Sequence, residues 1–300
     1  KIKMLLVSRN ITEIISWSFA NEDVENLLMN NEKTIKIQNP ISSDLSSLRS
    51  NLVGNLLLVV KKNLKKNVNN ISLFELGPVF TGVQPGEQEE FISVIRSGNF
   101  YEKNWIEKDK SFDIFDIKAD LDCLLKIFGF DIQKFNLIKS SRPYYHPGKS
   151  GSLKLGNQTV GFFGEIHPEV LENLSINIAT VAFEINLTRM MKFYKEKKTS
   201  KKEIKVSSFQ SSIRDFSFEI EKNIFSADLV STIREIDKDL IKSVTIFDNY
   251  EGENVKFTHK AVALEVKIQS DHKTLKDKEI NDLSNKIIKK VKNKFDARLR

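Results

Sequence analysis

Apolar and polar residues alternate with a period of two over residues 213–220, where Phe216, Phe218 and Ile220 are separated by Ser217 and Glu219. This spacing predicts a strand with one buried and one solvated face. Apolar residues then recur at helical spacing over 229–236, alternate over 244–247 and 262–268, and return to helical spacing over 280–295. The last third therefore predicts a strand, helix, strand, strand, helix order, which is a split βαβ (ferredoxin-like) α/β sandwich.

Polar residues mark where these elements should begin and end. Ser226 is a suitable N-cap for the first helix, and Thr274 with Asp277 resembles a capping box for the second. Residues 248–252 are expected to form a polar turn between the two middle strands, which then make a hairpin. The closing residues 297–300 are expected to add an edge strand.

The chain before residue 190 mixes both periodicities and predicts an α+β domain, a large mixed or antiparallel sheet with flanking helices. Strands are expected over 11–20, 34–40, 71–80, 91–98, 150–156, 159–166 and 180–187, and helices at the start and over 22–29, 52–64 and 113–128. Gly77-Pro78 should break its strand, because proline cannot donate to a sheet ladder. Gly156-Asn157 is typical of a tight hairpin turn.

Residues 192–207 lose apolar periodicity and become dense in charge. Such a stretch is typical of a linker. We therefore expect a core domain over 1–190, a basic linker over 191–207 and a C-terminal domain over 208–300.

The net charge of +7 is unevenly distributed. Residues 195–300 hold 24 Lys and Arg against 18 Asp and Glu, so this third carries +6 of the total. Lysines on the polar sides of an amphipathic helix are usually its solvated face, and the alternative is a patch that neutralises nucleic-acid phosphates. Charge alone therefore leaves both interpretations open.

Composition excludes several classes of protein. The chain is 40% hydrophobic and 29% charged, which is typical of a soluble globular protein, and no apolar run approaches the ~18 residues of a membrane span. Cys123 is the single cysteine, so no intramolecular disulfide is expected, and four histidines form no recognisable metal motif. We expect a cytoplasmic protein without a secretory leader. Because the chain lacks an initiating methionine, we also expect it to be a fragment.

The C-terminal sheet should leave one face free of helices. Ser217, Glu219, Thr245, Phe247, Ala261 and Ala263 are predicted on that face, and only Phe247 among them can stack on a base. RNA contact is therefore expected at the sheet's end and loops, with Tyr250 as the aromatic candidate. The alternative is that Tyr250 only packs against its own hairpin.

Several blocks resemble the bacterial phenylalanyl-tRNA synthetase β-subunit family. They are NPISSDLSSLR (39–49), LFELGPVF (73–80), HPGKS (146–150) and GFFGEIHPEVL (161–171), followed by RDFS (214–217), FDNYEG (247–252), KAVAL (260–264) and TLKDKEI (274–280). Two departures are Pro78, where the family usually has a basic residue, and Gln210, where it usually has proline. The resemblance covers nearly the whole chain. It implies the C-terminal part of a longer subunit, with a ferredoxin-fold anticodon-binding domain at its end.

The resemblance implies that residues 1–190 are a class II synthetase fold without an active site. Class II adenylation needs one arginine on a strand and a second after a Gly-rich turn, because both stabilise charge on the ATP phosphates. Residues 74–80 contain no arginine, and 181–187 do not form a Gly-x-Gly-x-x-Arg segment. We therefore expect no catalytic residue, metal or cofactor in this chain, with ATP and Mg²⁺ used by the holoenzyme.

The partners implied by the resemblance are a catalytic α subunit, in an α2β2 heterotetramer, and phenylalanine tRNA. Tyr250 is the first candidate for tRNA contact, by stacking, followed by Arg214, Lys260 and Lys273 by charge. The alternative is a purely structural module that assembles the synthetase without reading the anticodon.

Three further residues invite a functional interpretation. His146 and His167 are each followed by proline and lie near Glu165 in the pattern, but without a paired base or nucleophile they are expected to shape turns. Arg49 is expected to hold the fold or to face the α subunit.

Overall fold

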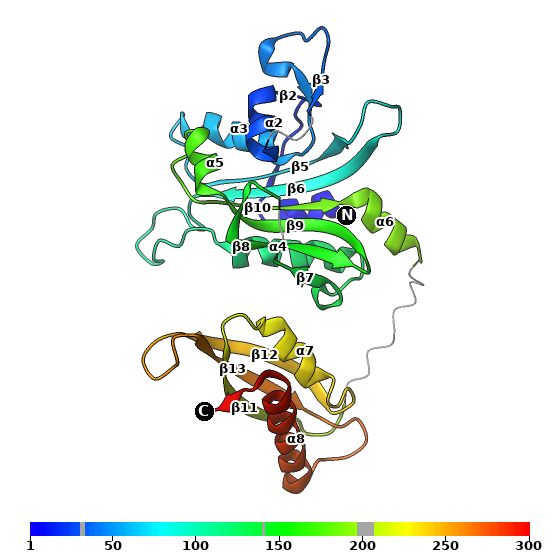
Figure 1. The fold of residues 1–300 in the computed structure, drawn as a ribbon, viewed down its shortest axis with the longest axis vertical. Coiled ribbons are helices and arrows are strands. Elements are labelled where there is room, and N and C mark those ends of the chain that lie inside the picture. Colours follow the sequence, from blue (N-terminus) through cyan, green and yellow to red (C-terminus); the bar gives the residue numbers. More distant parts are fainter. Residues whose placement is uncertain (31–33, 140–141, 197–206) are drawn as a thin grey trace. The chain divides into compact units, whose positions relative to one another are not determined.

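The computed structural model describes residues 1–30, 34–139, 142–196 and 207–300. They form two compact units, Lys1–Thr199 and Ser200–Arg300 (Figure 1). Among the described helices, none combines the length and apolar character that crossing a membrane requires.

A seven-stranded sheet is the centre of the first unit. Its strands follow the order β1-β5-β6-β10-β9-β8-β7, and most of them lie side by side in Figure 1. The β1–β5 pair is parallel and every other pair is antiparallel. The bounds are β1 Thr12–Glu13, β5 Ile71–Phe80, β6 Gln88–Ser97, β7 Asn136–Ile138, β8 Tyr145–Leu155, β9 Gln158–Ile166 and β10 Thr180–Asn186.

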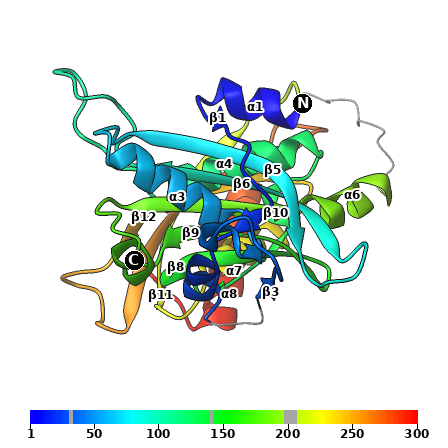
Figure 2. The same cartoon turned by 90° about the horizontal axis from the view of Figure 1, so that it is seen from above.

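Helices cover both faces of this sheet, and each face has its own apolar core. Helix α1 (Ile2–Ser8) packs beside α4 (Ile114–Ile127) on one face, together with the start of α6 (Leu187–Glu196) (Figure 2). The other face is covered by α2 (Glu22–Met29), α3 (Val53–Leu64) and α5 (Pro168–Asn173). Asp113 and Asp116 form a reciprocal capping box at the start of α4. The predicted mixed sheet with flanking helices is confirmed.

The strand predicted over 11–20 is wrong in extent, because two short strands replace it. After β1, Ser16 donates its backbone N–H and hydroxyl to the side-chain carboxylate of Glu75 rather than to the backbone of β5. Strand β2 (Phe19–Ala20) belongs to a separate small sheet, in which β4 (Ser47–Leu48) lies between β2 and β3 (Ile35–Lys36). Strand β3 is also shorter than predicted. Two short 3-10 helices, Ser43–Leu45 and Ile132–Lys134, complete the unit.

The predicted break at Gly77-Pro78 is also wrong, since β5 continues unbroken and pairs Pro78 with Glu90 of β6. Strand β1 pairs only with Leu73 and Phe74, so it does not reach Pro78. The nitrogen of Pro78, which has no hydrogen to donate, therefore lies on the side of β5 where no neighbouring strand requires a backbone hydrogen bond.

The second unit has the predicted order of elements. Strand β11 (Ser212–Glu221) is followed by α7 (Ser226–Arg234), β12 (Ile241–Tyr250), β13 (His259–Ile268), α8 (Asp277–Phe295) and the edge strand β14 (Arg298–Leu299). The sheet order is β12-β13-β11-β14, with every pair antiparallel. Both helices share one core with Phe216, Phe218 and Leu264, so they cover the same face. The ferredoxin-like prediction is confirmed.

Three boundaries in the second unit differ from prediction. Helix α7 begins at Ser226, so Phe225 and not Ser226 is its N-cap. Helix α8 begins at Asp277 rather than after Thr274, because Glu279 accepts the backbone N–H of Lys276. Strand β12 runs on to Tyr250 through a bulge near Ile246, so the segment predicted as a turn is partly strand.

The predicted linker, 191–207, begins within helix α6, which continues to Glu196. Residues 197–206 of that linker lie outside the described residues.

Candidate functional site

Tyr250 lies at the end of β12, directly opposite Ala261 of β13. Side chains alternate between the faces of a strand, and Val262 and Leu264 of β13 belong to the helix-covered core. Ala261 and its partner Tyr250 therefore lie on the face without helices. The Tyr250 side chain is 43% exposed.

The other three predicted residues do not gather around Tyr250. Lys260 is the neighbour of Ala261, so it lies at the same end of the sheet but on the opposite face. Arg214 pairs with Val266, about 17 Å further along β13 at ~3.4 Å per residue, and donates to the carbonyl of Ile213. Lys273 lies beyond the far end of β13, where its Nζ is 2.5 Å from Oε1 of Glu279.

Residues 251–258 form the loop beside Tyr250 and supply a second aromatic side chain. Phe257 is 92% exposed, and Nζ of Lys222 lies 5.1 Å from the centre of its ring. Lys222 also forms an ion pair with Glu251 at 2.8 Å, which ties the β11–α7 turn to the loop. Phe257 was not among the residues predicted from the sequence. The available signal was a large apolar residue inside an otherwise polar loop.

Glu219 pairs with Ala261, so it lies on the helix-free face as predicted, but its side chain is buried. Phe247, at the bulge in β12, is 60% exposed. The loop covers that end of the sheet, because the backbone N–H of Lys256 donates to Oε1 of Glu219 at 3.3 Å. A side chain at Gly252 would lie 2.6 Å from the Tyr250 hydroxyl oxygen. Glycine is therefore needed for the tyrosine ring to lie against the loop.

Charge at this end of the sheet is mixed. The strand ends and turns here carry both signs: Lys222, Lys256 and Lys260, and Glu219, Glu221, Glu251 and Glu253. Burial lowers the pKa of the Lys260 ammonium, and Glu251 offsets part of that effect. Exposed aromatic rings, rather than a concentration of positive charge, therefore distinguish this surface. We call Phe247, Tyr250 and Phe257 the aromatic end.

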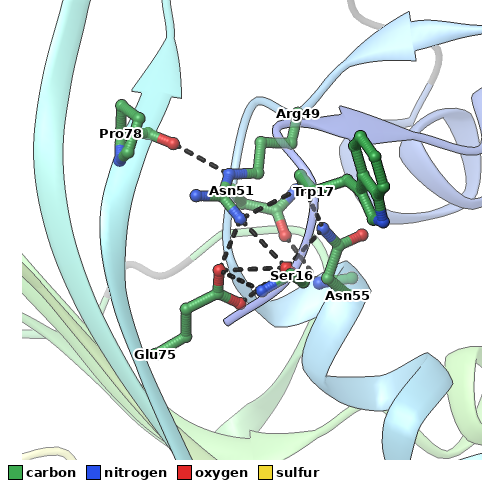
Figure 3. A network of polar contacts seen from close by, with 8 residues as sticks. Ser16, Trp17, Arg49, Asn51, Asn55, Glu75 and Pro78 are labelled. Carbon is green, nitrogen blue, oxygen red and sulfur yellow. Dashed lines mark hydrogen bonds and ion pairs between the residues drawn. The ribbon is translucent and has the colours of Figure 1, made fainter. Parts of the chain in front are cut away.

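A buried ion pair in the first unit links Arg49, which follows β4, to Glu75 of β5. Nη1 of Arg49 lies 2.7 Å from Oε1 of Glu75, and both side chains are almost fully buried (Figure 3). Arg49 also donates to the Pro78 carbonyl, the Ser16 hydroxyl and the Trp17 carbonyl, at 2.8, 3.0 and 3.4 Å. Arg49 is thus engaged in holding the fold.

The same network fixes an exposed segment. Asn55 of α3 donates to the Trp17 carbonyl at 3.0 Å and to the Ser16 hydroxyl at 2.9 Å (Figure 3). While Ser16 is held inward, the side chains of Ile15 and Trp17 on either side are 89% and 66% exposed. This exposed segment was not predicted from the sequence, because an alternating pattern predicts that its apolar residues are buried.

Glu25 is buried close to this network and accepts both the backbone N–H and the hydroxyl of Ser50, at 2.9 and 2.5 Å. Burial raises the pKa of the Glu25 carboxyl, although the Ser50 hydrogen bonds and the charges of Arg142 and Arg49 oppose the rise. A raised pKa means that the folded state holds this proton more tightly than the unfolded chain does.

We expect the Glu25→Gln substitution to change the pH dependence of stability. Wild-type stability from this group is present below the unfolded pKa and is lost as pH rises through the raised folded pKa, whereas glutamine does not titrate. As pH rises, the variant should therefore become more stable relative to wild type, by about 1.4 kcal/mol for each unit of pKa shift. Urea unfolding from pH 4 to 8 measures it, and a constant difference would contradict the prediction.

The two histidines shape turns, as predicted. Nδ1 of His146 accepts the N–H of Gly148 at 3.0 Å, and Nδ1 of His167 caps α5 by accepting the N–H of Glu169 at 3.3 Å. Within the described ranges, no group of three or more His, Cys, Asp or Glu side chains is arranged to hold a metal ion.

Two family models match the chain, one for each unit. Residues 1–187 match the phenylalanyl tRNA synthetase beta chain CLM domain, and residues 207–300 match the ferredoxin-fold anticodon binding domain. Together they support the order of domains that the sequence motifs predicted.

Similar proteins include phenylalanine–tRNA ligase beta subunits of Paramagnetospirillum magneticum (33% identical, 100% of this chain and 38% of the relative) and Bartonella quintana (34%, 99% and 38%). The chain thus spans less than two fifths of these relatives. Pyrrolysyl-tRNA synthetase of Desulfitobacterium hafniense has a similar fold, with a TM-score of 0.50 at 13% identity over 65% of this chain and 67% of that structure. This likeness supports the class II synthetase-like sheet. The chain belongs to the phenylalanyl-tRNA synthetase beta chain family.

Proposed function

We propose that this chain is the non-catalytic C-terminal part of a phenylalanine–tRNA ligase β subunit. Its last domain, residues 208–300, binds the anticodon region of phenylalanine tRNA, and its core domain, residues 1–190, docks a catalytic α subunit in an α2β2 assembly. Residues 191–207 link the two. ATP and Mg²⁺ are used by the cytoplasmic holoenzyme during aminoacylation and not by this part of the β subunit.

The observation that carries the RNA-binding proposal is the aromatic end, in a domain that matches an anticodon-binding family. Exposed aromatic rings stack on unpaired bases, such as those of an anticodon loop, and each stacked base contributes about 1–3 kcal/mol. Tyr250 and Phe257 remain the principal candidates. Lys260 is the predicted basic residue closest to them in the sheet, whereas Arg214 and Lys273 are candidates for more distant phosphates.

Replacing Tyr250 with alanine should weaken binding of phenylalanine tRNA by about 1–3 kcal/mol, since one stacking platform is lost. The measurement is a binding titration with phenylalanine tRNA and with an anticodon-substituted tRNA, at two salt concentrations. Tyr101→Ala is a matched control, because Tyr101 lies in the first unit and is equally exposed, at 43%. Unchanged affinity of a folded Tyr250→Ala protein would reject the assignment.

The alternative function is assembly of the synthetase without anticodon recognition. It predicts weak tRNA binding that depends on salt and ignores the anticodon, because only phosphate charge is then recognised. Tight association with the α subunit alongside such binding would favour this alternative.

The exposed segment around Trp17 is the surface that we propose for docking the α subunit. Exposed tryptophan and isoleucine side chains are costly on an isolated surface and typical of the centre of a protein interface. The backbone of the segment is already fixed by Arg49 and Asn55. Docking would therefore cost little conformational entropy there.

A further inference from the structure

A cavity of about 170 Å³ lies beside β5, β6, β9 and β10 of the first unit. Three charged residues line it, Arg142, Arg189 and Glu89. The rings of Phe91 and Phe162 form apolar parts of its wall. The charged wall therefore has a net positive charge. Val79 and Asn186 also line it, so the cavity lies beside the two strands, 74–80 and 181–187, that lack the adenylation arginines. The aromatic end belongs to the other unit.

Arg189 and Glu89 form a closed set of contacts. Nε and Nη2 of Arg189 donate to the two carboxylate oxygens of Glu89 at 3.0 and 3.1 Å, and Nη1 donates to the Thr159 carbonyl at 3.0 Å. The side-chain amide of Asn186 also donates to Glu89, at 2.8 Å. Three of the five N–H donors of Arg189 are thereby used.

Arg142 differs, because most of its donors have no acceptor among the residues that the structure describes. Within the described ranges its one hydrogen bond runs from Nη1 to the Tyr144 hydroxyl, at a long 3.3 Å. The guanidinium lies 4.9 Å from the centre of the Phe162 ring and 5.7 Å from that of Phe91. A guanidinium has five N–H donors, and the Arg142 side chain is 17% exposed, so its unpaired donors are accessible from the cavity.

The nearby carboxylate does not satisfy Arg142. Nη1 of Arg142 lies 3.9 Å from Oε2 of Glu184, beyond hydrogen-bond distance. The other oxygen of Glu184 accepts the hydroxyls of Tyr144 and Tyr145, at 2.5 and 3.2 Å. Glu184 is therefore held by the two tyrosines and balances the charge of Arg142 only at a distance.

We propose that this cavity binds a small oxyanion, a carboxylate or a phosphate, through the guanidinium of Arg142. The planar fork of arginine matches two oxygens of either group, and its charge strengthens both hydrogen bonds. The volume equals about five or six waters at ~30 Å³ each, which is enough for a small anion. The two phenylalanine rings hold the guanidinium in place. The site is independent of the proposed tRNA and α-subunit contacts.

The test is isothermal titration of the full chain with sodium phosphate and, separately, with sodium acetate, against sodium chloride at equal ionic strength. Saturable binding of phosphate or acetate with no response to chloride is the expected result, and the two titrations identify which anion is preferred. No saturable binding of either anion would overturn the proposal.

Two variants test whether the anion binds inside this cavity. Thr81 is exposed and lines the cavity, so Thr81→Phe should obstruct it and weaken binding at least tenfold, whereas Thr12→Phe on an exposed edge of the same unit should not. The double substitution Arg142→Met and Glu184→Gln removes both charges together, which avoids leaving one buried charge alone. It should abolish binding. Unaltered affinity in Thr81→Phe would place the anion elsewhere, even if the double variant failed to fold.

Discussion

Replacing Arg49 with methionine is expected to lower the free energy of unfolding of the first unit by about 3–5 kcal/mol. The Glu75 carboxylate would remain buried without its charged partner, and the Pro78 carbonyl would lose its donor. Both tryptophans of the chain, Trp17 and Trp105, lie in this unit. Urea unfolding followed by tryptophan fluorescence therefore measures this unit alone.

Two comparisons make this result specific. Lys62→Met changes an exposed side chain of α3 and should alter stability by no more than about 0.5 kcal/mol. Adding Glu75→Gln to Arg49→Met should recover part of the loss, because the uncompensated buried charge is then gone. A single Arg49→Met protein as stable as wild type would show that the network does not hold the fold.

Replacing Trp17 with alanine should weaken association with a purified α subunit by at least about 2 kcal/mol, which is roughly a 30-fold change in affinity. The physical reason is the loss of a large aromatic side chain whose backbone is already fixed by Asn55. Titration calorimetry or sedimentation with the α subunit measures the change.

Trp105→Ala is the matched control, because Trp105 is exposed in a different loop of the same unit. It should leave the association unchanged. If Trp105→Ala weakened the complex and Trp17→Ala did not, the α subunit would dock on the loop that carries Trp105. Both variants should retain tRNA binding, since that function is assigned to the other unit.

Prediction from the sequence worked best where the deciding interactions are local. Helix α2 was predicted with its observed bounds, because Asn21 caps it by accepting the N–H groups of Asp23 and Val24. The start of α8 was missed, because Glu279 binds back to Lys276 and shortens the helix relative to the expected Thr274 cap. Pro78 was misjudged because its tolerance depends on how far the neighbouring strand extends.

The candidate RNA surface was predictable only in part. Tyr250 was found because an aromatic residue follows an alternating strand, but its position opposite Ala261 depends on a bulge in β12. Phe257 was missed, because sequence patterns do not state whether an apolar residue in a loop is covered. The structure exposes it fully beside Lys222.

The sequence by itself determined the family and the order of elements in the C-terminal third, because periodicity and short motifs are properties of neighbouring residues. In the first unit it did not predict β7 or α5. Only the tertiary structure decided that Arg214 and Lys273 lie away from Tyr250, and that Arg49 is bound to Glu75. Strand register and the packing of distant segments set these contacts. A guanidinium whose donors are already bound is unavailable to a ligand. Arg49 and Arg142 are the same residue type, but Arg49 has a structural role because its donors are bound within the fold, whereas Arg142 makes one long hydrogen bond.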